Sequence, residues 1–309
     1  MGIRKFLKNN LPDVVLEPLK QAYSDMHYAA MHVVPEEWYL KRQFLKKVGY
    51  PLNLDNPKTF NEKLQWLKLH DRNPLYTKMV DKYEAKKYVA DIIGEEYIIP
   101  TLGVWDNFDE IDFDKLPNQF VLKCTHDSGS IAICKDKAAF DKKAARKKLE
   151  RGLRYNYYYA GGFEWPYKNV KPRIIAEKYM IDELTKELRD YKFFTFHGEP
   201  KALFVATDRM KDDETKFDFY DMEFNHLDFK SGHPNAKNHI EKPKNFDLMK
   251  KLASVLAGDT AHLRVDFYEI NGRVYWGELT FYHWSGLVQY DPVEWDGKFG
   301  QWLDLNVMK

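Results

Sequence analysis

The 309-residue sequence predicts an α+β fold in which helices come first and antiparallel strands follow. Apolar residues recur at helical spacing up to about residue 93, whereas short apolar runs separated by turn residues dominate from residue 97 onward. Two of the later runs are joined by Asn271-Gly272, which is the strongest short-range signal for a β-hairpin. A chain of this length buries a sizeable core, and we expect it to hold two subdomains.

The first part of the chain predicts helices. Residues 1–55 are typical of several short helices, and their basic amphipathic start, residues 3–8, suits either a membrane surface or, as we favour, packing onto the rest of the protein. Asn56-Pro57 and the capping box from Thr59 to Glu62 predict a helix over 57–70. Asp81-Lys82 opens another helix, whose apolar face continues to residue 93.

The later part predicts strands, with two helices between them. The expected strands cover residues 119–124, 130–134, 173–180, 190–196 and 201–206, and the expected helices cover 138–153 and 245–256. The last two of these strands form a hairpin across residues 197–200. Between the first two strands lies a loop of small polar residues, 125–129. Residues 155–167 are aromatic and contain glycine, which is typical of a mobile flap.

The hairpin around Asn271-Gly272 carries a chemical pattern. Arg264 and Asp266 lie on its first strand, and Glu278 and Thr280 lie on its second. Carboxylates beside a cation suit Mg²⁺ and phosphate, since Mg²⁺ is bound by one or two carboxylates plus substrate phosphates. A solvated charged face is the alternative.

The geometry of the turn decides between these two interpretations. A two-residue turn at Asn271-Gly272 sets Asp266 and Glu278 on opposite faces of the sheet. A three-residue loop, 270–272, pairs Glu269 with Arg273 and returns both carboxylates to one face. We therefore predict the three-residue loop.

Composition excludes several classes of function. The sequence has 48 Lys and Arg residues against 47 Asp and Glu residues, so no net charge favours nucleic acid. Cys124 and Cys134 fit neither a metal spacing nor a disulfide framework, and we expect them buried in a reduced compartment. The histidines show no zinc-ligand spacing, and no apolar run has the length of a membrane helix. A cytoplasmic location is expected.

Three charged residues are candidates for nucleotide binding. Lys123 ends a strand just before the small-residue loop, where main-chain N–H groups can cradle phosphate, and Lys82 stands at a helix start. Each is a weak signal alone. Glu177 follows four strand residues, three of them apolar, and a buried carboxylate there needs a partner. An adenine amino group and a nearby Lys or Arg are both possible partners.

Five segments, taken in order, resemble the ATP-grasp superfamily and specifically its TupA-like branch, which is linked to cell-surface polysaccharide synthesis. The segments are Asn56-Pro-Lys-Thr-Phe-Asn-Glu-Lys-Leu-Gln-Trp66, Asp81-Lys-Tyr83, Phe120-Val-Leu-Lys123, Ile174-Ile-Ala-Glu-Lys-Tyr179 and Glu278-Leu-Thr-Phe-Tyr282. The resemblance runs from about residue 35 to near the end of the chain. It implies two α/β subdomains, 74–184 and 185–309, whose antiparallel sheets grip ATP, after a helical segment, 1–73.

The resemblance also implies a role for each candidate residue. Phosphate contacts would come from Lys82, Lys123 and the loop residues Ser128, Gly129 and Ser130. The adenine ring would meet Glu177 and the main chain of Lys178 and Met180, while Asp190 and Lys192 would lie near ribose and phosphates. Asp266, Glu278 and Thr280 would hold Mg²⁺, and Arg264 would stabilise the tetrahedral intermediate.

Three features depart from the wider superfamily. Thr280 stands where a third metal ligand is usually Asn, so that ligand is weaker or is replaced. Ser285-Gly286 follows an inserted segment, 281–284, which implies a remodelled substrate pocket. A helical segment takes the place of the usual N-terminal α/β domain.

The implied activity is an ATP- and Mg²⁺-dependent ligase that joins a carboxylate to an amine through an acyl phosphate. The polysaccharide context favours a uronic acid or an amino acid as substrate. Two alternatives stay open. A glycosyltransferase would use a nucleotide-sugar, for which Asp212-Asp213 is a poor Asp-x-Asp motif. A non-catalytic nucleotide-binding module would explain Thr280 as a decayed metal ligand.

Overall fold

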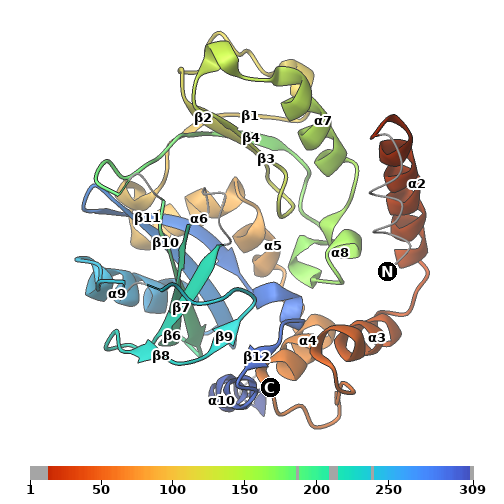
Figure 1. The fold of residues 1–309 in the computed structure, drawn as a ribbon, viewed down its shortest axis with the longest axis vertical. Helices are drawn as coiled ribbons and strands as arrows, with labels where there is room; N and C mark the ends of the chain where they lie inside the picture. The colour runs from red at the N-terminus through yellow and green to blue at the C-terminus, as the bar shows by residue number, and fades with distance from the viewer. Residues whose placement is uncertain (1–12, 186–187, 209–214, 238–239, 307–309) are drawn as a thin grey trace.

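The computed structural model describes residues 13–185, 188–208, 215–237 and 240–306 and contains two main antiparallel sheets (Figure 1). The smaller sheet has the order β1-β4-β2-β3 and the larger has the order β11-β10-β5-β6-β7-β8, with a separate β12-β9 pair. The strands are β1 Thr101–Trp105, β2 Phe120–Cys124, β3 Ile131–Cys134, β4 Ile174–Lys178, β5 Asp190–Phe196, β6 Glu199–Thr207, β7 Lys216–Tyr220, β8 His226–Leu227, β9 Lys230–Ser231, β10 His262–Ile270, β11 Arg273–Thr280 and β12 Tyr290–Asp291.

Helices pack on both sheets and fill the N-terminal part of the chain (Figure 1). The α-helices are α2 Asp13–Met31, α3 Glu36–Val48, α4 Phe60–His70, α5 Leu75–Val80, α6 Glu84–Ile93, α7 Lys142–Leu153, α8 Tyr157–Ala160, α9 Phe246–Ala257 and α10 Glu294–Trp302. Five short 3-10 helices join them: η1 Glu95–Tyr97, η2 Phe108–Glu110, η3 Lys137–Ala139, η4 Trp165–Tyr167 and η5 His283–Gly286. Within the described part of the chain, no helix is both long and apolar enough to cross a membrane.

Most predicted elements are confirmed, but their boundaries differ. The helix expected over 57–70 begins at Phe60, because Thr59 caps it: the Thr59 hydroxyl accepts the Glu62 amide at 3.2 Å, and Glu62 accepts the Thr59 amide at 3.1 Å. The predicted start at Asn56-Pro57 is therefore wrong. Strand β1 and helix α5 were not predicted. The basic start at residues 3–8 and Asp212-Asp213 lie outside the described residues.

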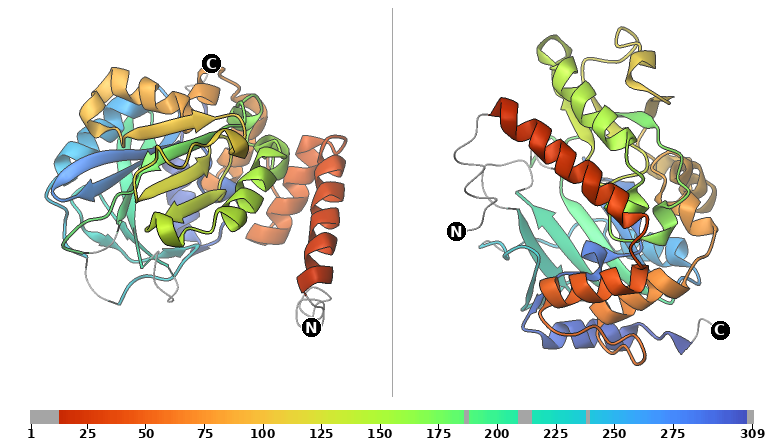
Figure 2. Two further views of the ribbon diagram at one scale, coloured as in Figure 1. Left: turned by 90° about the horizontal axis from the view of Figure 1, so that it is seen from above. Right: turned by 90° about the vertical axis from the view of Figure 1, so that its right-hand side faces the viewer.

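The aromatic segment 155–167 is not the mobile flap that its composition predicted. It forms α8 and η4, and its side chains Tyr158 and Phe163 are buried together with Met31. The segment packs beside α2 (Figure 2), where the Tyr28 ring meets the Tyr155 ring edge-on at 5.0 Å. Tyr158 and Phe163 are therefore core residues of the contact between α2 and α8.

Strand β5 explains how the larger sheet is stabilised on both faces. Successive side chains of a strand point to opposite faces. Phe193 packs against Phe246 of α9, with ring centroids 5.8 Å apart, while Phe194 packs against Phe60 of α4 at 6.2 Å and Phe299 of α10 at 5.2 Å. Every residue of β5 is buried. Helices thus cover both faces of the sheet near Phe194.

The contact between α10 and α4 gives a stability prediction. A Cβ added at Gly300 would lie 2.2 Å from the Lys58 carbonyl oxygen, so we expect Gly300→Ala to lower the free energy of unfolding by about 1–3 kcal/mol. Gly297 of the same helix is the matched control, because a Cβ there meets nothing within 4 Å. Gly297→Ala is expected to be neutral or stabilising by about 1 kcal/mol. Urea unfolding of both variants measures the difference, and equal midpoints would contradict it.

Candidate functional site

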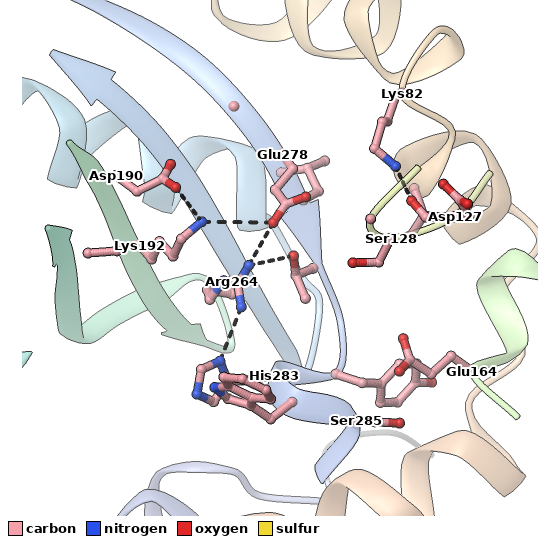
Figure 3. A pocket seen from close by; sticks show the side chains of 18 of the residues that line it. Lys82, Asp127, Ser128, Glu164, Asp190, Lys192, Arg264, Glu278, His283 and Ser285 are labelled. Atoms are coloured by element: carbon pink, nitrogen blue, oxygen red, sulfur yellow. Dashed lines mark hydrogen bonds and ion pairs between the residues drawn. The ribbon is translucent and has the colours of Figure 1, made fainter. Parts of the chain in front are cut away.

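A cavity of about 720 Å³ lies between the two sheets and is lined by residues from both (Figure 3). Ten of the fourteen predicted site residues line it. These ten are Lys82, Lys123, Ser128, Gly129, Ser130, Asp190, Lys192, Arg264, Glu278 and Thr280. The other four, Glu177, Lys178, Met180 and Asp266, are not part of its lining. The structure therefore brings the predicted phosphate residues together with Glu278 and Thr280, and it leaves Asp266 and the predicted adenine contacts outside the cavity lining.

The hairpin places Asp266 and Glu278 on one face, but through a different backbone feature from the predicted one. Ile270 pairs with Arg273, so the turn has two residues, with φ of 51° at Asn271 and 74° at Gly272. The predicted three-residue loop is wrong. A register shift instead follows Asp266, which pairs with Glu278, while Phe267 pairs with Trp276. The intervening Gly277 is the extra residue of a β-bulge, and this bulge restores the shared face.

Arg264 connects the polar residues of this face. Its Nε and Nη2 donate to the two carboxylate oxygens of Asp266 at 2.8 and 2.7 Å. The same Nη2 donates to Glu278 at 2.8 Å and to the Thr280 hydroxyl at 3.0 Å, and Nη1 donates to Nδ1 of His283 at 3.1 Å. Arg264 is buried, so this fan of bonds fixes the planar guanidinium at the cavity wall (Figure 3).

Lys192 supplies the second positive charge of the face. Its ammonium group bonds Asp266 and lies 3.2 Å from Asp190 and 3.8 Å from Glu278. Strand pairing explains the meeting, because Lys192 lies directly opposite Asp266 on the neighbouring strand. Three carboxyl groups thus share two cations.

Electrostatics keep Glu278 ionised. Burial opposes its charge, but Lys192 and Arg264 hold its pKa well below the usual range. The Asp266 side chain is fully buried, and burial raises its pKa against the lowering effects of Arg264 and Lys192. Glu278 is 45% exposed at its side chain, so it is the carboxylate of the pair that reaches the cavity.

The donor set of this face fits Mg²⁺. Asp266, Glu278 and Thr280 offer only oxygen atoms, which Mg²⁺ prefers. Among the described residues no group of three or more His, Cys, Asp and Glu side chains forms a metal site made of protein alone. Mg²⁺ needs no such group, since substrate phosphates and water complete its shell. The assignment of these three residues to the metal stays a prediction.

The opposite wall of the cavity is suited to phosphate. The Lys82 ammonium bonds the Asp127 carbonyl oxygen, and the Lys82 amide donates to Thr125 at 3.0 Å, so this lysine is docked on the loop 125–130. Gly129 adopts a φ of +101°, a conformation that glycine favours. Within the described residues, the amides of Ser128 and Gly129 donate no main-chain hydrogen bond. They remain able to bind an anion.

The partners of Glu177 are two lysines. Lys86 lies 2.7 Å and Lys123 lies 2.5 Å from its two carboxylate oxygens. Burial opposes ionisation of Glu177, but the two ammonium groups lower its pKa to about 2. Of the two partners that the sequence left open, the structure shows lysine. The Lys178 amide donates to the Pro100 carbonyl at 3.0 Å, so only its carbonyl side is left for an adenine contact, which stays a prediction.

Sequence reasoning missed several side chains of the cavity. Glu164, Tyr157, Tyr167 and His283 line it, and Lys68 is buried just behind it. A single acidic residue between Phe163 and Trp165 was the available signal for Glu164, of the kind that identified Glu177. Burial and the neighbouring Arg264 lower the pKa of His283 far below its usual range, so this imidazole is neutral.

Comparison with known proteins places the fold. Residues 62–304 match the model of the family described as TupA-like ATPgrasp. No curated protein sequence matches the chain.

Similar solved structures include two D-alanine–D-alanine ligases and D-cycloserine synthetase DcsG. The ligase from Bacillus anthracis, complexed with ATP, is 19% identical over 68% of this chain and 57% of its own, with a TM-score of 0.38. The Helicobacter pylori ligase is 16% identical over 80% and 70%, with a TM-score of 0.38. DcsG is 16% identical over 76% and 72%, with a TM-score of 0.41.

The family match covers most of the chain, from the capping box of α4 to the residues that follow α10. It includes every residue of the cavity described above. The chain belongs to the TupA-like ATP-grasp family and has the ATP-grasp fold, preceded by a helical N-terminal segment.

Proposed function

We propose that the protein is an ATP- and Mg²⁺-dependent ligase that joins a carboxylate to an amine through an acyl phosphate. One observation carries the proposal. A single cavity has the Arg264–Lys192–Glu278 cluster on one wall and Lys82 with the loop 125–130 on the other. This combination of cations, carboxylates and main-chain amides suits a nucleoside triphosphate and its metal. The family and the charge pattern both support the proposal.

The chain supplies alignment and charge rather than a nucleophile. The substrate carboxylate attacks the γ-phosphate, and the amine then displaces phosphate from the acyl phosphate. Lys82, Lys123 and the amides of Ser128 and Gly129 bind phosphate oxygens, while Arg264 and Lys192 stabilise the negative charge that develops. Asp266, Glu278 and Thr280 would hold Mg²⁺, which would neutralise phosphate charge. Positioning of this kind accounts for large rate enhancements without covalent catalysis.

The substrates and the setting belong to the same proposal. The polysaccharide context that the resemblance implies favours a uronic acid or an amino acid as the carboxylate and an amino compound as the acceptor. The proposal also includes a cytoplasmic location, contact with a membrane surface and two subdomains with the boundaries 74–184 and 185–309.

Release of ADP and phosphate from Mg-ATP tests the ligase. The assay contains the twenty amino acids with glucuronate and galacturonate, and it compares the wild type with Glu278→Gln. We expect release to depend on the added compounds and to fall about a hundredfold in the variant, because Glu278 is the cavity-facing carboxylate beside Arg264. Glu183→Gln, at an exposed position outside the cavity, is the control and should keep full activity.

Two results would contradict the proposal. Full turnover in Glu278→Gln would remove the role given to that carboxylate. Absence of release in the wild type, together with binding of a nucleotide-sugar and not of ATP, would favour a glycosyltransferase.

A further inference from the structure

Glu164 is a buried carboxylate that no part of the proposed ATP site uses. It precedes η4, is 6% exposed and lines the cavity on the wall that faces Arg264 and Glu278 (Figure 3). Within the described part of the chain it forms no ion pair. A buried carboxylate without a cation at contact distance is costly, so Glu164 is expected to gain a positively charged partner when the site is filled.

The nearest buried cation, Lys68, is already engaged. Its three donors bind the Gly162 carbonyl at 3.0 Å, the Ser285 carbonyl at 2.9 Å and the Ser285 hydroxyl at 2.8 Å. Burial lowers the pKa of Lys68 to about 8, and Glu164 opposes that shift. Lys68 therefore holds the part of the cavity wall that carries Glu164. Its charge acts on Glu164, but its three donors bind Gly162 and Ser285 rather than the Glu164 carboxylate.

Burial and polar neighbours act in opposite directions on the Glu164 carboxyl group. Burial raises the pKa of Glu164, while Lys68, the Ser285 hydroxyl and Arg264 oppose the rise. The titratable and charged groups that face Glu164 are Lys68, Arg264, Tyr157, Tyr167 and Tyr282. Burial raises the pKa of each of these tyrosines, so they stay protonated. Glu164 is thus the only carboxyl group among them.

Strained backbone surrounds the same subsite. Phe163, Trp284 and Ser285 have φ of 64°, 49° and 57°, the left-handed region that non-glycine residues rarely adopt. Such residues are strained and persist where the surroundings hold them, often at functional sites. Here the Lys68 hydrogen bonds to Gly162 and Ser285 hold both strained segments. The strain therefore helps to present Glu164 and Ser285 to the cavity.

We propose that Glu164 is the catalytic base of the second half-reaction: it binds the ammonium group of the acceptor and removes its proton. This inference rests on the proposed ligase function and adds the acceptor subsite to it. The acceptor is accordingly a primary amine that enters as a cation, on the wall opposite the phosphate-stabilising Arg264.

The acceptor R–NH₃⁺ gives one proton to the Glu164 carboxylate, and the freed lone pair of R–NH₂ attacks the carbonyl carbon of the acyl phosphate. A C–N bond forms, and the C–O bond to phosphate breaks with its electron pair on the phosphate oxygen. The second nitrogen proton leaves with phosphate as HPO₄²⁻. Glu164 then returns its proton to solvent.

Hydroxylamine separates this role from the rest of the reaction. Hydroxylamine is uncharged at neutral pH and traps acyl phosphates as hydroxamates without needing a base. The wild type and Glu164→Gln are compared for hydroxamate formation and for ligation of the twenty amino acids, glucosamine and methylamine, each with Mg-ATP and the carboxylate pool. We expect the variant to form hydroxamate within about twofold of the wild type. Amine ligation should fall about a hundredfold or more, since a hundredfold is the lower end of the range for general-base catalysis.

Three controls keep the outcomes distinct. Glu164→Asp retains a carboxylate and should regain part of the ligation, and Glu183→Gln should match the wild type. In thermal melts with Mg-ADP, the amines should raise the melting temperature of the wild type and not that of Glu164→Gln. No hydroxamate in the wild type would overturn the ligase itself. Equal losses of hydroxamate and amide, or equal stabilisation of both proteins by amines, would overturn the role of Glu164 alone.

Discussion

Replacement of Arg264 by methionine is expected to lower Mg-ATP turnover about a thousandfold, the upper range for loss of one charge-stabilising donor. The variant removes the cation that binds Asp266, Glu278 and Thr280 in one fan of hydrogen bonds. It also leaves the fully buried Asp266 with Lys192 alone. Phosphate release with the pooled amino acids and uronic acids measures the loss, and nucleotide binding to the same variant shows whether the site still fills.

A lysine at position 264 is the matched variant. Arg264→Lys keeps the charge but cannot reproduce the planar bonds to both Asp266 oxygens, so we expect turnover between those of the wild type and Arg264→Met. A thermal melt of each variant sets the assay temperature below unfolding. Turnover of Arg264→Met within threefold of the wild type, with the fold intact, would contradict a role for Arg264 in charge stabilisation.

The hairpin shows what local pattern can and cannot provide. The sequence predicted that Asp266 and Glu278 share a face, and the structure confirms their pairing. The predicted means was wrong, because the register is corrected at Gly277 rather than at the turn. A lone glycine inside a strand is itself a bulge signal. Its location depends on packing: a Cβ at Gly277 would lie 3.0 Å from the Tyr268 ring and 3.2 Å from the Asp266 carbonyl.

Long-range contacts explain the residues that sequence reasoning missed. Elements with strong local periodicity, such as α4 and the β5–β6 hairpin, were predictable. Arg264 and Glu278 followed from the pattern of the Asn271-Gly272 hairpin, whereas Lys192 was identified only through the family resemblance. Glu164 and Lys68 are about a hundred residues apart and meet only through Gly162 and Ser285, which no local pattern encodes. The composition of residues 155–167 predicted a mobile flap. Tyr158 and Phe163 are buried because α2, which is distant in the sequence, packs against them, and local composition does not reveal this contact.

The second large effect concerns the stability of the smaller sheet. Glu177→Gln is expected to lower the free energy of unfolding at pH 7 by about 3–5 kcal/mol, because it leaves the buried Lys86 ammonium without its counter-charge. The Lys86→Met, Glu177→Gln double variant is the control. Removal of both charges is expected to restore most of the loss, since apolar replacement of a buried pair is often neutral. Urea unfolding of the wild type, the single variants and the double variant gives the free energies of unfolding for a double-mutant cycle.

The same pair predicts how stability depends on pH. The folded-state pKa of Glu177 is about 2, below its ordinary value of 4.5, so unfolding takes up a proton. The stability that Glu177 contributes is therefore complete above pH 4.5 and is lost as the pH falls toward 2. Between these values the free energy of unfolding of the wild type should fall more steeply than that of Glu177→Gln, and the two curves should converge. Parallel curves would mean that Glu177 has the same pKa in the folded and the unfolded protein, and stabilisation of its charge by Lys86 and Lys123 would then be excluded.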